Sequence, residues 1–266
     1  MREWNVDSPQ VIDIDGEVRS LAVRLVAGHV DVVTTDGPAR VEVTEIDGDP
    51  VTVTIDDEGR LVIRHLQLTW GGILGWLRSE RRRAVVSVAV PARCDTSIGV
   101  VSADAVVAGV EGRIDVRCVS GDVILDRVTG TVAAESVSGD VEARGLAGGI
   151  GLKSVSGGLT LVDGAPDKVR VDSVSGDVAL DVHSAGRLDV AVNTVSGDIA
   201  VRVPDEVGLS IDLMSTSGDV ASSFDGLAEE IRPGSRRLRG SVGDGSGHLR
   251  GRTVSGSLAV LVRQPA

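Results

Sequence analysis

A short motif that returns about every 18 residues most constrains what this chain can fold into. It reads Val-Ser-Gly, or once Thr-Ser-Gly, and most copies continue with an aspartate and an aliphatic residue. The motif serines are Ser120, Ser138, Ser156, Ser175, Ser196, Ser217 and Ser255, after a degenerate copy at Ser102. Successive serines lie 18, 18, 18, 19, 21, 21 and 38 residues apart, and we interpret the last step as two coils with one motif lost. Such a period is typical of a solenoid, in which each repeat stacks on its neighbours.

Each repeat predicts two short strands joined by glycine corners. In residues 131–148, apolar residues alternate with outward residues before and after the motif, as in strands with one buried face. We expect Val137, the valine of the motif, to point inward after a change of phase. Motif glycines such as Gly139, and a second series that includes Gly148, favour corners with positive φ. The expected fold class is all-β: a single-stranded β-solenoid of stacked two-strand coils, about 18–21 residues each.

The first part of the chain has strand patterns without the motif. Alternating segments such as 21–25 and 41–43 are separated by turn signals such as Gly28. We predict an irregular β N-terminal region at residues 1–95, continuous with a regular solenoid at residues 96–266. A small antiparallel cap is the alternative for the first region, because the open end of a solenoid has to be covered.

The composition limits the classes of partner. The chain has 266 residues, a net charge of −12 and only 2% aromatic residues, which argues against nucleic-acid binding. The charged N-terminus lacks an apolar leader, and no stretch approaches 18 apolar residues. Cys94 and Cys118 are expected to be free thiols, because the coil neighbour of Cys118 is Val100. These features predict a cytoplasmic protein. A peripheral position at the membrane surface is the alternative that they leave open.

One aromatic and basic segment interrupts the pattern at residues 68–83. Two of the three tryptophans lie here, beside a run of arginines in an otherwise acidic chain. Tryptophan and arginine together are typical of contacts with a protein partner or an anionic membrane surface. The candidate contact residues are Trp70, Ile73, Leu74, Trp76, Leu77, Arg78, Arg81, Arg82 and Arg83. The alternative is an insertion whose apolar side chains cover part of the core.

No motif in the chain predicts catalysis, a cofactor or a metal site. The four histidines are isolated, and no phosphate-binding glycine loop ends in a lysine. The strongest candidates for chemistry are the aspartates that follow motif glycines: Asp122, Asp140, Asp177, Asp198 and Asp219. We expect each to accept hydrogen bonds from its own turn and to face water. The alternatives are a Ca²⁺ site or the acid pair of a β-helix carbohydrate enzyme.

A family resemblance rests on the repeated motif. The Val-Ser-Gly-Asp-Val units, with Ala84–Pro91 before them and Thr253–Ser257 at the end, resemble the bacterial "putative adhesin" family. The resemblance covers about residues 15–263, and it implies a β-solenoid related to autotransporter-adhesin heads and adhesion at a surface. We therefore expect a non-enzymatic scaffold or interaction protein. The alternatives are a cytoplasmic protein that self-associates end to end and a β-helix enzyme that acts on glycans.

Overall fold

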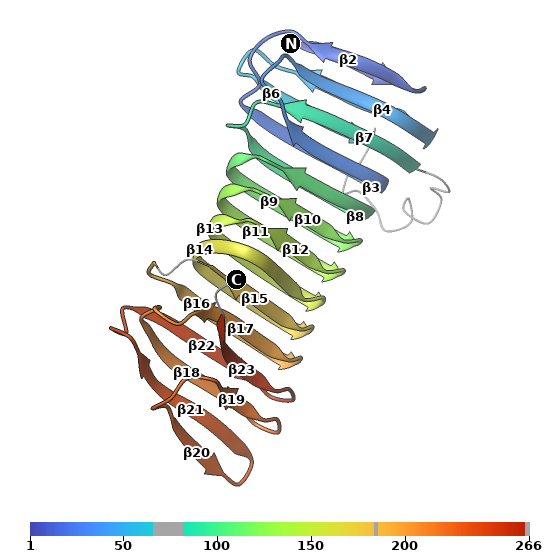
Figure 1. Cartoon of the computed structure of the whole chain (residues 1–266). Helices are drawn as coiled ribbons and strands as arrows, with labels where there is room; N and C mark the ends of the chain where they lie inside the picture. Colours follow the sequence, from blue (N-terminus) through green and yellow to red (C-terminus); the bar gives the residue numbers. More distant parts are fainter. Residues whose placement is uncertain (66–81, 184–185, 264–266) are drawn as a thin grey trace. The chain divides into compact units, whose positions relative to one another are not determined.

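The computed structural model describes residues 1–65, 82–183 and 186–263. Every regular element in these ranges is a β-strand (Figure 1), which confirms the all-β prediction. No helix long and apolar enough to cross a membrane occurs in the described ranges. The chain divides into two compact units, Met1–Ile124 (unit 1) and Leu125–Ala266 (unit 2). The predicted division at residue 95 stays a prediction.

Unit 1 combines antiparallel and parallel pairing. Its strands are β1 (Arg2–Val6), β2 (Gln10–Ile14), β3 (Ser20–Thr34), β4 (Ala39–Gly48), β5 (Val51–Ile55), β6 (Arg60–His65), β7 (Arg82–Val90), β8 (Asp95–Ala108) and β9 (Glu111–Ser120). Antiparallel pairs join β1 to β5, β5 to β6, β2 to β4 and β4 to β7. Parallel pairs join β3 to β6, β7 and β8, and β8 to β9. Val100 pairs with Cys118, as predicted, and both cysteines are buried free thiols.

The long strand β3 lies between strands that are far from it in sequence. Ser20 pairs with Arg60 on one side and with Asp95 on the other. From Ala27 onward, β7 replaces β6 as the partner on the first side, while β8 remains the partner on the other side. Gly28 has a φ of +123°, and a Cβ there would lie 1.8 Å from the carbonyl oxygen of Ala84. Glycine is therefore required where β3 moves from one partner strand to the next.

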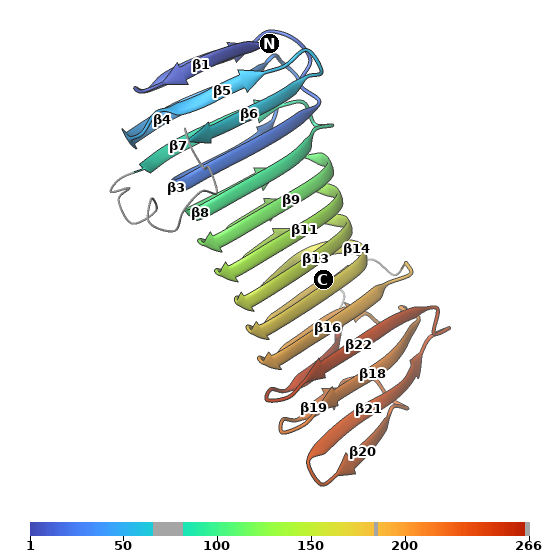
Figure 2. The same ribbon diagram turned by 180° about the vertical axis from the view of Figure 1, so that it is seen from behind.

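Unit 2 contains the parallel, solenoid-like core. Its strands are β11 (Thr129–Ser138), β12 (Val141–Arg144), β13 (Ala147–Ser156), β14 (Leu159–Ser175), β15 (Val178–Val182), β16 (Asp189–Ser196), β17 (Ile199–Pro204), β18 (Leu209–Ser215), β19 (Val220–Ser222), β20 (Ala228–Arg232), β21 (Ser235–Val242), β22 (Gly247–Thr253) and β23 (Leu258–Arg263), while β10 (Val123–Asp126) spans the unit boundary. One parallel series runs β11–β13–β14–β16–β22–β18 (Figure 2). The other runs β12–β14–β15–β17–β23–β19. Gly130 pairs with Gly148 and Val141 with Leu159, so the register equals the 18-residue period.

The last repeat does not follow the order of the chain. Strand β22 pairs in parallel with both β16 and β18, and β23 pairs in parallel with both β17 and β19. The chain reaches this place through the antiparallel hairpin β20–β21, which extends the sheet beyond β18. The interpretation of the 38-residue step as two coils with one lost motif is therefore wrong. Those residues contain an edge hairpin and a strand inserted between two earlier ones.

The valine of the motif points outward, which corrects the predicted phase. Val137 is 49% exposed, whereas the residue before it, Ser136, is only 8% exposed. The strand alternation continues unbroken to the turn, and the hydroxyl of Ser136 donates to the carbonyl oxygen of Gly139 at 3.3 Å. A small hydroxyl group can therefore be buried without losing its hydrogen bond. The same inward position is occupied in the other unit 2 repeats by Ser154, Ser173, Thr194, Ser215 and Thr253.

Candidate functional site

The predicted contact segment falls almost entirely outside the described residues. This applies to Trp70, Ile73, Leu74, Trp76, Leu77, Arg78 and Arg81. Arg82 begins β7, and its guanidinium Nε lies 2.6 Å from Oδ2 of Asp49 in an ion pair. Arg83 is exposed and pairs in register with Asp47 on β4. Arg82 thus has a structural partner within unit 1, while the contact role of the segment stays a prediction.

The motif aspartates join neighbouring repeats, which corrects the expectation that each serves its own turn. Oδ1 of Asp140 accepts a hydrogen bond from the backbone amide of Gly158 at 2.7 Å. Oδ1 of Asp177 accepts one from the amide of Asp198 at 2.8 Å, and Asp198 does the same for Ser257 at 2.7 Å. Each carboxylate therefore stabilises the turn stacked on it. Among the residues that the structure describes, no three potential ligand side chains are placed to hold a metal ion.

Millimolar Ca²⁺ should leave the melting temperature of the protein unchanged within about 1 °C, because Oδ1 of each of these three aspartates already accepts a backbone hydrogen bond. Differential scanning fluorimetry with and without Ca²⁺ checks this. Asp198→Ala is the matched variant, and it should lower stability equally in both buffers. A saturable Ca²⁺-dependent rise that disappears in Asp198→Ala would contradict the structural role and support a Ca²⁺ site.

One sheet face of unit 2 concentrates basic side chains, and we call it the basic face. It consists of the outward residues of the strand series from β11 to β18, with those of β21 and β20. Its basic residues are Lys153, Lys168, Arg170, Arg232, Arg237, Arg239, Arg250 and Arg252, and its acidic residues are Glu135, Asp167, Asp172, Asp189, Asp212 and Glu230. Eight cations against six anions leave this face positive in a chain whose net charge is −12. Both lysines of the chain lie on it.

Two of the acids on the basic face are already paired. Arg237 binds both carboxylate oxygens of Asp212 at 2.8 Å, and this pairing holds the pKa of Asp212 below its ordinary value. Asp172 accepts from Asn193 at 2.8 Å and from Arg170 at 3.1 Å, and these hydrogen bonds likewise lower its pKa. These carboxylates stay ionised and engaged at neutral pH. The positive charge left over belongs mainly to cations without such partners.

A shallow hollow of about 220 Å³ lies in the basic face. Its charged and polar lining consists of Lys168, Arg170, Asp189, Ser210, Asp212, His248 and Arg250. The small side chain of Ala191 lies between Arg170 and Arg250 in the register of three adjacent strands. The hollow can accept a small polar group that touches several charged side chains at once.

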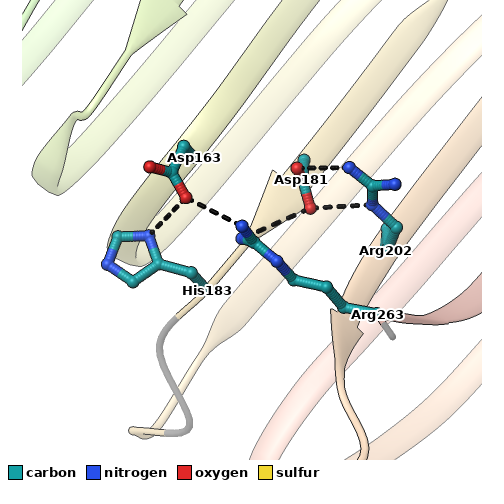
Figure 3. Close-up of polar contacts among 5 residues, drawn as sticks. All are labelled: Asp163, Asp181, His183, Arg202 and Arg263. Carbon is teal, nitrogen blue, oxygen red and sulfur yellow. Dashed lines mark hydrogen bonds and ion pairs between the residues drawn. The ribbon is translucent and has the colours of Figure 1, made fainter. Parts of the chain in front are cut away.

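A second polar cluster in unit 2 ties strands together (Figure 3). The carboxylate of Asp163 lies 2.9 Å from Arg263 and 3.5 Å from Nδ1 of His183. Arg263 also lies 3.5 Å from Asp181, which forms a two-oxygen contact with Arg202. The hydrogen bond from Arg202 is the main cause of the lowered pKa of Asp181. Each carboxylate of this network is bound by an arginine, and the contacts link β14, β15, β17 and β23.

Sequence reasoning missed the basic face. Its residues are distributed over eight strands and form no run in the chain. A signal was present, because Lys153 and Asp172 stand at the same place in successive repeats, one residue before the buried hydroxyl. Assigning the hydroxyl residue instead of the valine to the inward face would have placed these charges on one outward face.

Comparisons with known proteins identify the family and the fold. The profile of the Toastrack DUF4097 family matches residues 92–188 and 152–261, which together cover more than half of the chain. A "putative adhesin" from Parabacteroides distasonis has a solved structure with a TM-score of 0.53 at 13% identity, covering 96% of each chain. A "Putative lipid binding protein" from the same organism has a TM-score of 0.51 at 12% identity, covering 98% of each chain. No curated protein matches significantly.

Proposed function

The chain belongs to the Toastrack DUF4097 family, and from this premise we propose that it is a non-enzymatic, adhesin-like interaction scaffold that binds an anionic membrane surface. The basic face carries this proposal, with eight cations and six anions in a chain of net charge −12. The proposal includes stacked two-strand coils, about 18–21 residues each, with an irregular β region before them. The 18-residue register of β11 with β13 and of β12 with β14 supports that description.

A flat sheet suits contact with a charged surface. Outward residues repeat about every 6.6 Å along a strand, and neighbouring strands lie about 4.8 Å apart, so several cations can reach one plane together. Each arginine or lysine next to an anionic bilayer contributes about 1 kcal/mol. One protein of this fold bears the name "Putative lipid binding protein", and lipid contact is in keeping with that name. We place the protein in the cytoplasm, at the inner membrane surface, with segment 68–83 as a further contact.

The two alternatives have less support. End-to-end assembly would need an edge strand that can pair with another chain. The edge strand β20 is exposed along its whole length and carries three charged residues, Glu229, Glu230 and Arg232. Charged edges oppose pairing with another chain. A glycan-active enzyme would need two free carboxyl groups that face one cleft, whereas Asp172 and Asp212 on the basic face are held by arginines.

The double variant Lys153→Glu/Arg252→Glu should bind anionic vesicles at least about 30-fold more weakly than the native protein. Both side chains are exposed on the basic face and lie outside its hollow. Each lost cation removes an attraction to the anionic lipids of about 1 kcal/mol, and each new glutamate is repelled by them. Together these changes account for the expected size of the loss. The measurement is co-sedimentation with phosphatidylcholine vesicles that do or do not contain phosphatidylglycerol.

The matched control is Arg127→Glu/Arg144→Glu, which changes the net charge equally at exposed positions of unit 2 outside the strands of this face. We expect the control to bind within about threefold of the native protein, because screened charges act over about 8–10 Å. Equal losses in the two double variants would contradict a role for the basic face. Equal binding of the native protein to neutral and anionic vesicles would do the same.

A further inference from the structure

Two cations in the hollow of the basic face form no ion pair with the described residues, although the carboxylate of Asp212 interacts electrostatically with Arg250. Lys168 and Arg250 form no ion pair with any described residue, whereas Arg170 donates to Asp172 at 3.1 Å. Arg170 and Arg250 flank Ala191 in register on β14 and β22. An anion above Ala191 would therefore meet positive side chains from two sides. A phosphate group suits this arrangement, since arginine and lysine bind its oxygens through charge-assisted hydrogen bonds.

Asp189 adds a carboxylate to the lining of the same hollow. It stands on β16 between Lys168 and His248. Its Oδ1 atom is buried and receives no hydrogen bond from the described residues, while its Oδ2 atom lies 3.6 Å from Nε of Arg187. The Asp189 side chain is 40% exposed, so the rest of its carboxylate is accessible from the hollow. A bare anion would also be repelled by this carboxylate, whereas a ligand that carries a hydroxyl group could donate to it.

We propose that the hollow binds a polyol phosphate, with the phosphate beside Arg250 and Lys168 and a hydroxyl group donating to the exposed part of the Asp189 carboxylate. Glycerol phosphate is the smallest ligand of this class, and it exists both as a free molecule and as the headgroup of phosphatidylglycerol. The inference deepens the proposed function, and it rests on that function where the ligand is a lipid headgroup. The two sources share one chemistry, and the experiment below separates them.

Calorimetric titration of the full chain with sn-glycerol 3-phosphate and with inorganic phosphate tests the hollow directly. Glycerol 3-phosphate should bind saturably and about tenfold more tightly than phosphate, because its hydroxyl groups can donate to Asp189 while its phosphate group contacts Lys168 and Arg250. Arg250→Gln should weaken both ligands about tenfold. Asp189→Ala should tighten phosphate binding, because a like charge is removed, and abolish the preference for glycerol 3-phosphate.

Glu135→Ala is the matched control, since it removes one carboxylate from the same face outside the hollow. It should retain the tenfold preference of the native protein. The proposal is overturned if neither ligand binds saturably, or if the preference survives in Asp189→Ala. Two ligands of equal affinity for the native protein would overturn it as well.

Vesicles separate the two sources of the ligand. If saturating glycerol 3-phosphate releases the protein from phosphatidylglycerol vesicles, the hollow binds the lipid headgroup; if the protein stays bound, the hollow takes a free polyol phosphate. Both results support the site. Vesicle binding without any binding of glycerol 3-phosphate would overturn this inference and leave the proposed function standing. Binding of glycerol 3-phosphate without vesicle binding would overturn the proposed function alone.

Discussion

Gly176→Val is expected to lower the free energy of unfolding by at least about 3 kcal/mol, which corresponds to a fall in Tm of roughly 6–12 °C. Gly176 has a φ of +154°, and a Cβ at this position would lie 2.3 Å from the carbonyl oxygen of Gly157 in the repeat below. The next motif glycine repeats the arrangement, because a Cβ at Gly197 would lie 2.2 Å from the carbonyl oxygen of Gly176. Valine would thus force two stacked backbones apart and break hydrogen bonds between repeats.

A second glycine separates this clash from backbone strain alone. Gly16 has a φ of +113°, but nothing lies within 4 Å of a Cβ placed there. Gly16→Val should therefore cost only about 1 kcal/mol. Asp140→Ala, which removes the hydrogen bond to the amide of Gly158, should cost a similar amount. Thermal unfolding of the three variants gives the comparison, and a cost for Gly176→Val no larger than that for Gly16→Val would contradict the stacking of motif glycines.

The repeat could be predicted from the sequence, but the order of the strands could not. The spacing of the motif serines corresponds directly to the 18-residue register of the parallel pairs. In contrast, β3 pairs residue 20 with residue 95, and β22 enters between β16 and β18. Alternating aliphatic patterns look alike in all these strands, so they specify which face is buried and not which neighbour is chosen.

The candidate site could not be predicted because the wrong residue of the motif was assigned to the inward face. Val137 was expected inside because aliphatic residues are usually buried, yet Ser136 is the inward residue, since its hydroxyl reaches a turn carbonyl. With the phase set by that serine, Glu135 and Lys153 become outward neighbours on adjacent strands. The basic face follows from this register, but its hollow also depends on the insertion of β22, which brings Arg250 beside Ala191. Only the folded chain supplies that contact.

His65 should make the protein lose stability on mild acidification. Its side chain is only 1% exposed at the end of β6, and its Nδ1 accepts a hydrogen bond from the amide of Val26 at 3.2 Å. Burial lowers the pKa of His65 to about 4; the positive charge of Arg82 adds to the effect, and Asp49 opposes it. The folded protein therefore binds the imidazole proton more weakly than the unfolded chain does.

The direction of the pH effect follows from these two pKa values. An unfolded histidine titrates near 6.5. At pH 7.5, His65 is therefore neutral in both states, and its protonation does not change the free energy of unfolding. As the pH falls from 6.5 toward 4, the unfolded chain takes up the proton first, and stability decreases by about 2–3 kcal/mol before levelling off. The carboxylates of Asp172 and Asp212 have lowered pKa values, so their contribution is lost only at still lower pH.

Urea unfolding at pH 7.5, 6.0, 5.0 and 4.5 measures this dependence, with His65→Gln as the matched variant. Glutamine can accept the hydrogen bond from Val26 but does not titrate, so the variant should be less stable at pH 7.5 and lose little more by pH 4.5. The native curve should fall toward that of the variant as the pH decreases. Parallel curves over the whole range would contradict a buried neutral imidazole at His65 and would attribute the acid sensitivity to other groups. Convergence of the curves would instead identify this one side chain as the main source of instability between pH 6.5 and 4.5.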